Sequence, residues 1–97
     1  MIRKIDEDIF NGKTQGDDRE LFNVNGYRLI DGDKFTKKNE KGEVVEKEQS
    51  YFLFDDNTKD IYELTLQQAY DLLALYADKD VEEGVLCEDI MELIESN

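Results

Sequence analysis

The sequence predicts an α+β fold, in which an antiparallel β meander of about four to five strands carries two C-terminal helices on one face. Two observations predict it. Residues 20–64 hold short runs of β-branched and aromatic residues separated by turn formers, as strands do. Residues 65–97 change to apolar spacings of three and four, as helices do. At 97 residues we expect one domain over 1–97, strand-rich over 20–64 and helical over 65–97.

An Asn-Gly pair is the strongest local signal in the strand-rich region. Asn25 and Gly26 separate two apolar-bearing runs, Leu21–Val24 and Tyr27–Ile30. Both central residues of a type I′ turn need a positive φ, which asparagine and glycine adopt easily. The sequence therefore predicts a two-residue hairpin here. Asp31–Asp33 then predicts a further turn, because it combines aspartates with glycine.

The rest of the meander is predicted from alternating charged and apolar runs. Residues 34–38 and 43–48 predict a second, highly charged hairpin around the turn at 39–42. The aromatic run 50–54 is typical of a central strand. A turn at 55–59 leads into a last strand at 61–64.

The N-terminus is open to two interpretations. Ile2, Ile5, Ile9 and Phe10 have the spacing of a short helix, with Gly12 placed to end it. A strand is the alternative, because no capping residue precedes Met1. Residues 11–19 have no periodicity and predict a loop.

Two helices are predicted in the C-terminal third. Thr65 and Gln68 have capping-box spacing and predict a helix from Leu66 to about Asp78. Apolar residues cover most of its circumference, so we expect it to be largely buried against the sheet. A second helix, near 86–95, has apolar residues on one side only, and we doubt that it is regular before Gly84. The predicted core is Phe22, Val24, Leu29, Phe52, Phe54, Ile61, Leu66, Leu73, Ile90 and Leu93.

Net charge narrows the class of partner. The chain carries −13, from 25 acidic and 12 basic residues. Such a surface repels nucleic acid and anionic membranes and attracts basic proteins. The charge is concentrated, because residues 65–97 hold nine acids and one lysine. The alternative is that the charge serves solubility alone.

Catalysis and cofactors are not expected. There is no histidine and one cysteine, so neither a Ser-His-Asp triad nor a zinc site can be built. Cys87 falls among the apolar positions of the last helix, where an inert buried thiol is expected. The acids near Asp31 and Asp55 lack the glycine and glutamate spacing of a calcium loop, so turn chemistry explains them. With no disulfide pair, membrane-length apolar run or signal-peptide pattern, we expect a cytoplasmic protein.

The acidic helical end is the candidate site. Glu88, Glu92 and Glu95 repeat at i, i+4 and i+7, which places carboxylates roughly 6 Å apart along one helix face. This spacing is comparable to the roughly 6–7 Å step between phosphates of a nucleic-acid strand. A solvated helix face is the alternative meaning of the pattern. The predicted partner-binding residues are Asp71, Asp78, Asp80, Glu82, Glu83, Glu88, Asp89, Glu92 and Glu95, with Asp55, Asp56 and Asp60 as a second patch.

In size, charge and the acidic pattern of this helix, the chain resembles a functional class rather than a sequence family. The class is small acidic proteins, often from phages or mobile elements, that mimic DNA to block restriction enzymes, CRISPR effectors or repair enzymes. The resemblance implies an inhibitor that occupies the basic cleft of a DNA- or RNA-handling protein. We expect the chain to be a monomer or homodimer. One alternative is an immunity protein or antitoxin that neutralises a basic toxin. Another is a protein–protein adaptor in which exposed Tyr70, Tyr76 or Met91 matters more than the acids.

Overall fold

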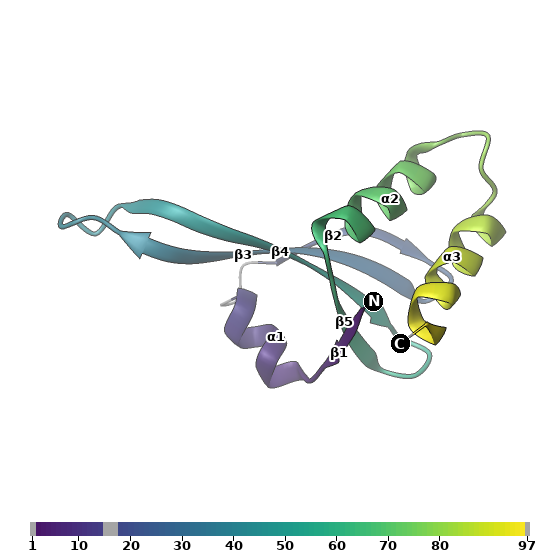
Figure 1. The fold of residues 1–97 in the computed structure, drawn as a ribbon, viewed down its shortest axis with the longest axis horizontal. Helices are drawn as coiled ribbons and strands as arrows, with labels where there is room; N and C mark the ends of the chain where they lie inside the picture. Colours follow the sequence, from purple (N-terminus) through teal and green to yellow (C-terminus); the bar gives the residue numbers. More distant parts are fainter. Residues whose placement is uncertain (1, 15–17, 97) are drawn as a thin grey trace.

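A five-stranded antiparallel sheet forms the centre of the molecule (Figure 1). The structure is a computed structural model that describes residues 2–14 and 18–96, with the backbone alone for 33–38 and 44–48. The strands are β1 (Arg3–Ile5), β2 (Asp18–Val24), β3 (Tyr27–Lys38), β4 (Val44–Asp55) and β5 (Asp60–Leu64). The helices are α1 (Glu7–Thr14), α2 (Leu66–Ala77) and α3 (Glu83–Glu95). The strand order is β1-β5-β4-β3-β2, so β2 to β5 form a meander and β1 joins it at the β5 edge. The predicted α+β fold is confirmed.

Two separate apolar clusters lie on the two faces of the sheet. Neighbouring residues of β4 belong to different clusters, because successive strand side chains point to opposite faces. Leu53 lies with residues of α2 and α3, whereas Phe52 lies with α1, and both are fully buried. The sheet is therefore covered on both sides, and β4 is its central strand, as predicted.

The helix α1 covers one face through aromatic contacts. The ring centroid of Phe10 lies 4.9 Å from that of Phe52 and 4.9 Å from that of Phe54, both edge-on. Ile5 of β1 and Ile30 of β3 complete this smaller cluster. Edge-to-face ring pairs add stabilisation beyond the burial of their area.

The helices α2 and α3 lie together on the other face, as predicted. Ala69 and Leu72 of α2 and Leu86 and Ile90 of α3 are buried in the larger cluster. The capping box of α2 is also confirmed. The Gln68 amide N–H donates to the Thr65 hydroxyl at 3.2 Å, and the Thr65 N–H donates to the Gln68 side chain at 2.9 Å.

The two hairpin turns predicted at 25–26 and 39–42 are both present. Asn25 and Gly26 have φ values of 51° and 85°, as the predicted type I′ turn requires. In the second turn, the Asn39 side-chain oxygen accepts the amides of Lys41 and Glu43, both at 2.9 Å. The charged side chains predicted in that hairpin at 34–38 and 44–48 lie outside the described side chains.

The second hairpin is the end of a long arm that projects from the body (Figure 1). Among the described residues, β3 pairs with β2 as far as Gly32, and β4 pairs with β5 from Tyr51 onward. Beyond these residues β3 and β4 pair with each other alone. The molecule measures 49 × 28 × 20 Å, and its radius of gyration is 14.6 Å. A compact chain of this length would have a radius of gyration of about 12.5 Å, so the arm makes the molecule elongated.

The turn predicted at Asp31–Asp33 is wrong, because β3 runs straight through it. Gly32 is needed for packing rather than for turning. A Cβ built on Gly32 would lie 2.5 Å from the Thr14 side chain and 3.2 Å from the Phe52 ring. Thr14, at the end of α1, is buried over this glycine, and its hydroxyl donates to the Phe10 carbonyl at 3.1 Å.

The N-terminal expectations are wrong in part. Both a strand and a helix form, divided at Asp6, whose carboxylate accepts the Ile9 amide at 2.8 Å as an N-cap does. Ile2 and Ile5 lie on opposite faces of the sheet, which a helical stripe cannot achieve. Gly12 lies inside α1 instead of ending it, and Asp18 already belongs to β2. The predicted loop at 11–19 is therefore wrong over 11–14 and 18–19, and residues 15–17 lie outside the described residues.

The expectation that α2 is largely buried is also wrong. Only Ala69 and Leu72 of this helix are buried, while Leu66, Tyr70 and Tyr76 are each about half exposed. The physical reason is that α2 rests on the sheet along one stripe, and no element of the described chain covers its outer side. The prediction that Leu66 belongs to the core is therefore wrong. Five other residues of the predicted core are buried: Phe22, Val24, Leu29, Phe52 and Ile90. The remaining four are half-buried against the two clusters: Phe54, Ile61, Leu73 and Leu93.

The last helix begins slightly earlier than expected. α3 starts at Glu83, so Gly84 and Val85 are helical, and Val85 is 44% exposed.

Within the described residues, no helix has both the length and the apolar character that crossing a membrane requires.

Gly32→Ala should lower the free energy of unfolding by about 1–3 kcal/mol, because the new methyl group overlaps Thr14 and Phe52. Gly12→Ala is the matched control, since its Cβ would meet nothing within 4 Å and α1 would gain helix propensity. Chemical denaturation of both variants measures the effect. Equal stability of Gly32→Ala and the unaltered protein would contradict the close packing of α1 on β3.

Candidate partner-binding surface

The nine acids predicted in the C-terminal third lie on α2, on α3 and in the link between them. Asp71 is on α2 and is exposed. Asp78 is the residue after α2, and its carboxylate accepts the Asp80 amide at 2.9 Å, which shapes the link. Glu82 is the residue before α3 and Glu83 is its first residue, where negative charge is favourable to the helix dipole. The other four lie farther along α3.

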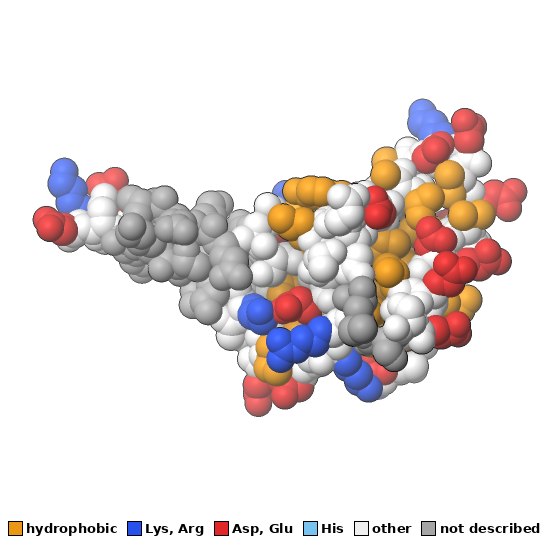
Figure 2. Space-filling view, in the orientation of Figure 1, with side chains coloured by type: hydrophobic (Ala, Val, Ile, Leu, Met, Phe, Trp, Pro, Cys, Tyr) orange, Lys and Arg blue, Asp and Glu red, His pale blue; other side chains and the backbone are white. Residues whose placement is uncertain are grey.

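Three of these acids form a continuous line on the outer side of α3. Glu88, Glu92 and Glu95, called here the acidic stripe, are all exposed. Leu86 and Ile90, which anchor α3 on the sheet, occupy the opposite side of the helix. The stripe therefore points away from the sheet, as its spacing predicts. Figure 2 shows the acidic side chains gathered along this end of the molecule.

The acids of the two C-terminal helices have no described cationic partner. The described ion pairs all lie in the sheet, in the turn after β4 and in α1: Lys4–Asp60, Lys13–Glu63, Arg19–Asp31, Arg28–Glu20 and Arg28–Asp56. Among the described side chains, none of these pairs involves residues 65–96, whose only lysine is Lys79. The charge of this end is therefore not neutralised within the described part of the chain.

The three turn acids predicted as a second patch have internal partners. Asp55 is buried, and its carboxylate accepts the Asn57 amide at 3.0 Å. Asp56 accepts two hydrogen bonds from Arg28, at 2.8 and 3.0 Å. Asp60 lies 3.0 Å from the Lys4 ammonium, which links β5 to β1. These acids contribute to the fold and offer less free charge than the stripe.

The Lys4–Asp60 pair responds to pH. Its hydrogen bond lowers the pKa of Asp60 and raises the pKa of Lys4. A lowered carboxyl pKa stabilises the fold above the ordinary value of 3.8, and the contribution is lost as pH falls through the lowered value. Both groups are at the surface, so the effect on stability is small.

A groove runs between α2 and α3. Its volume is about 340 Å³. Its lining residues are Gln68, Asp71, Leu72, Asp89, Glu92, Leu93 and Ser96. Apolar side chains are visible in Figure 2 between the two helices, with acidic side chains beside them. The structure thus brings together three of the predicted acids, Asp71, Asp89 and Glu92, across one groove.

Sequence reasoning did not identify the groove residues Gln68, Leu72, Leu93 and Ser96. Leu93 was expected in the core, and it is only half-buried because the helices do not close over it. The exposed side chains Tyr70, Tyr76 and Met91, in contrast, were singled out for an apolar interface, and they are 51%, 50% and 43% exposed. Leu66 was also expected in the core, and it is exposed. Its position directly after the cap residue Thr65, at the end of the helix, was a signal of this exposure.

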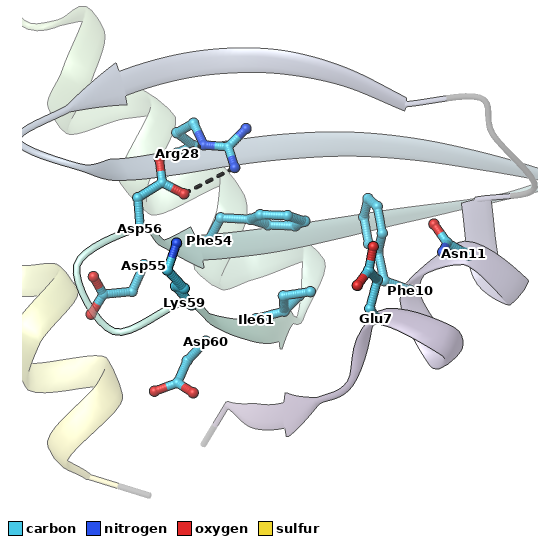
Figure 3. A pocket seen from close by; sticks show the side chains of 10 residues that line it. All are labelled: Glu7, Phe10, Asn11, Arg28, Phe54, Asp55, Asp56, Lys59, Asp60 and Ile61. Carbon is cyan, nitrogen blue, oxygen red and sulfur yellow. Dashed lines mark hydrogen bonds and ion pairs between the residues drawn. The ribbon is translucent and has the colours of Figure 1, made fainter.

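A second pocket, of about 380 Å³, lies on the α1 side of the sheet (Figure 3). Phe10, Phe54 and Ile61 form its apolar wall. Arg28 lies over the Phe54 ring at 4.8 Å while it is bound to Asp56. Arg28, Asp55 and Asp56 of this pocket are therefore engaged in holding the turn at 55–59.

The described residues contain no group of three or more cysteine, aspartate or glutamate side chains placed to hold a metal ion. Cys87, expected to be buried, is half-buried. Its sulfur accepts a hydrogen bond from the Asn25 side chain at 3.3 Å. This contact joins α3 to the first hairpin turn.

Together, the fold and this surface define a small α+β protein with an unneutralised acidic helical face. Comparison with known protein families, with characterised proteins and with solved structures found no match to the chain.

Replacing two acids near the end of α3 should stabilise the protein. Glu92→Lys with Glu95→Lys places positive charge in the last turn, where the helix dipole favours it and no basic residue is present. We expect about 0.5–1 kcal/mol of added stability at low salt, decreasing as salt screens the interaction. Thermal unfolding at two salt concentrations measures it.

The control is Glu40→Lys with Glu43→Lys, which changes the net charge equally at the exposed tip of the arm. A loss of stability in the α3 variant alone would mean that Glu92 or Glu95 has a stabilising contact within the chain, contrary to this structure.

Proposed function

We propose that this protein binds a basic nucleic-acid-handling protein through the acidic stripe and inhibits it by occupying its phosphate-binding cleft. The protein acts by binding rather than by catalysis, and such a partner places it in the cytoplasm. The observation that carries the proposal is the charge segregation: Lys4, Lys13, Arg19 and Arg28 pair with acids of the sheet and of the turn after β4, whereas no described ion pair involves the stripe.

The energetics of α3 support a functional role for the stripe. Glu92 and Glu95 lie in the last turn, where the negative end of the helix dipole opposes them. Glu88 and Glu92 are also one turn apart, where like charges repel by a few tenths of a kcal/mol. If the charge served solubility alone, acids at positions without this electrostatic cost would be sufficient. A binding surface, in contrast, requires negative charge on this particular face of α3.

The geometry of the stripe suits a cleft that evolved for phosphates. Its carboxylates repeat at intervals of roughly 6 Å on a rigid helix. Lysine and arginine side chains that donate to phosphates can also donate to carboxylates in similar positions, and the association releases counterions. Attraction between the −13 chain and a basic partner also speeds their encounter at low salt.

A second candidate function is an adaptor with an apolar interface. It is favoured by the exposure of Leu66 and Tyr70 on α2, each about 50%, and of Met91 on α3. An apolar interface depends weakly on ionic strength, whereas a charge-based one weakens steeply. An immunity protein would share the charge-based behaviour and differ in the identity of its partner.

Reversing the stripe should abolish binding without unfolding the protein. We expect the Glu88→Lys, Glu92→Lys, Glu95→Lys variant to lose the partner that the unaltered protein captures from a lysate of its own cells at low salt. The captured protein should be released by added salt and by excess duplex DNA or RNA, because both compete for the same basic cleft. Mass spectrometry identifies it, and an activity assay of that protein shows inhibition.

The matched control reverses Asp18, Glu40 and Glu43, which are exposed acids of β2 and the arm tip. This variant has the same net charge as the stripe variant and should still capture the partner. Equal loss in both variants would show that net charge alone acts. A partner that withstands high salt and is lost from a Leu66→Ser, Met91→Ser variant would establish the adaptor function instead.

A further inference from the structure

The groove between α2 and α3 combines an apolar floor with an acidic rim. Leu72, which is 2% exposed, and Leu93 form the floor. Asp71 stands on the α2 side, and Asp89 and Glu92 stand on the α3 side. Among the described side chains, no lysine or arginine lines the groove. It is thus different from the acidic stripe, which is a convex helix surface.

The carboxylates of the rim retain capacity for a ligand. One Asp71 oxygen accepts the Gln67 side-chain amide at 2.8 Å, which leaves the other oxygen available. Within the described residues, the carboxylates of Asp89 and Glu92 have neither a hydrogen bond nor an ion pair. Three negative groups on both sides of one groove repel one another, and a cation between them removes that repulsion.

We infer that this groove binds one long basic side chain of the partner, and arginine in preference to lysine; the inference rests on the proposed function. Arginine and lysine have an aliphatic stem and a charged head, so the stem covers apolar surface while the head reaches polar groups. Here the stem lies on Leu72 and Leu93, and the head lies between Asp71 and Glu92. Arginine is preferred because its planar head forms paired hydrogen bonds with carboxylates.

The size of the groove agrees with a side chain and not with a whole helix. Its volume of about 340 Å³ is at the lower end of ligand pockets, which span roughly 300–1,000 Å³. A buried arginine in a pocket at the centre of an interface is a common source of binding energy. The groove would therefore fix the orientation of the partner on the acidic end.

The test is an NMR titration of the full-length, ¹⁵N-labelled protein with the tripeptide acetyl-Ala-Arg-Ala-amide. Matched peptides carry lysine or uncharged citrulline in place of arginine. We expect saturable shifts of the amides of Gln68, Asp71, Leu72, Asp89 and Glu92 with arginine. Lysine should bind several-fold more weakly, and citrulline should give no saturable shift.

Two isosteric double variants make the test specific. Asp71→Asn with Glu92→Gln removes two charges from the groove and should weaken arginine binding about tenfold. Glu88→Gln with Glu95→Gln removes two charges from the stripe alone and should change it less than about twofold. Amide spectra of both variants establish that they are folded.

Equal weakening by both double variants, or shifts spread evenly along α3, would overturn the groove inference and show general attraction to acidic surface. The proposed function would then still stand if stripe reversal abolishes partner capture. If the groove binds arginine as expected and a Glu88→Lys, Glu95→Lys variant, which leaves the groove residue Glu92 unchanged, still captures the partner, the groove inference holds and the proposed function fails.

Discussion

The burial of β4 on both of its faces is the constraint on which the rest of the structure depends. Phe52 and Leu53 are adjacent, point in opposite directions and are both fully buried. A strand in this position needs a covering layer on each side. A chain of 97 residues has enough helix for one thin layer on each face. The outer sides of α2 and α3 are consequently left to solvent, and the acidic end of the molecule is there.

The distribution of cations decides where the negative charge remains unbalanced. Arg19, Arg28, Lys4 and Lys13 are all in or beside the sheet, where each pairs with an acid on a neighbouring element. These pairs link separate elements to one another. In α3, all the charged residues are acidic, so the same pairing is not possible within that helix. Its charge is therefore available to a partner rather than to the fold.

Features governed by neighbouring residues could be predicted from the sequence, and features governed by distant contacts could not. The turn at Asn25 and the capping box at Thr65 follow from local backbone rules, and both are confirmed. The turn expected at Gly32 failed because Thr14, far away in the sequence, packs on that glycine. The prediction that α2 is largely buried failed because helical periodicity shows which side of a helix is apolar, and not whether another layer covers that side.

The same distinction applies to the candidate site. The acidic stripe could be predicted, since it depends on helical spacing alone, and its residues are exposed as expected. The groove could not be predicted, because it depends on the distance between α2 and α3 and on the incomplete burial of Leu93. Glu92 belongs to both the acidic stripe and the groove. On the proposed function, the stripe accelerates encounter through long-range attraction, and the groove slows dissociation through one specific contact. Charge alone attracts many basic proteins, so selection among them depends on the part of the surface that has a defined shape.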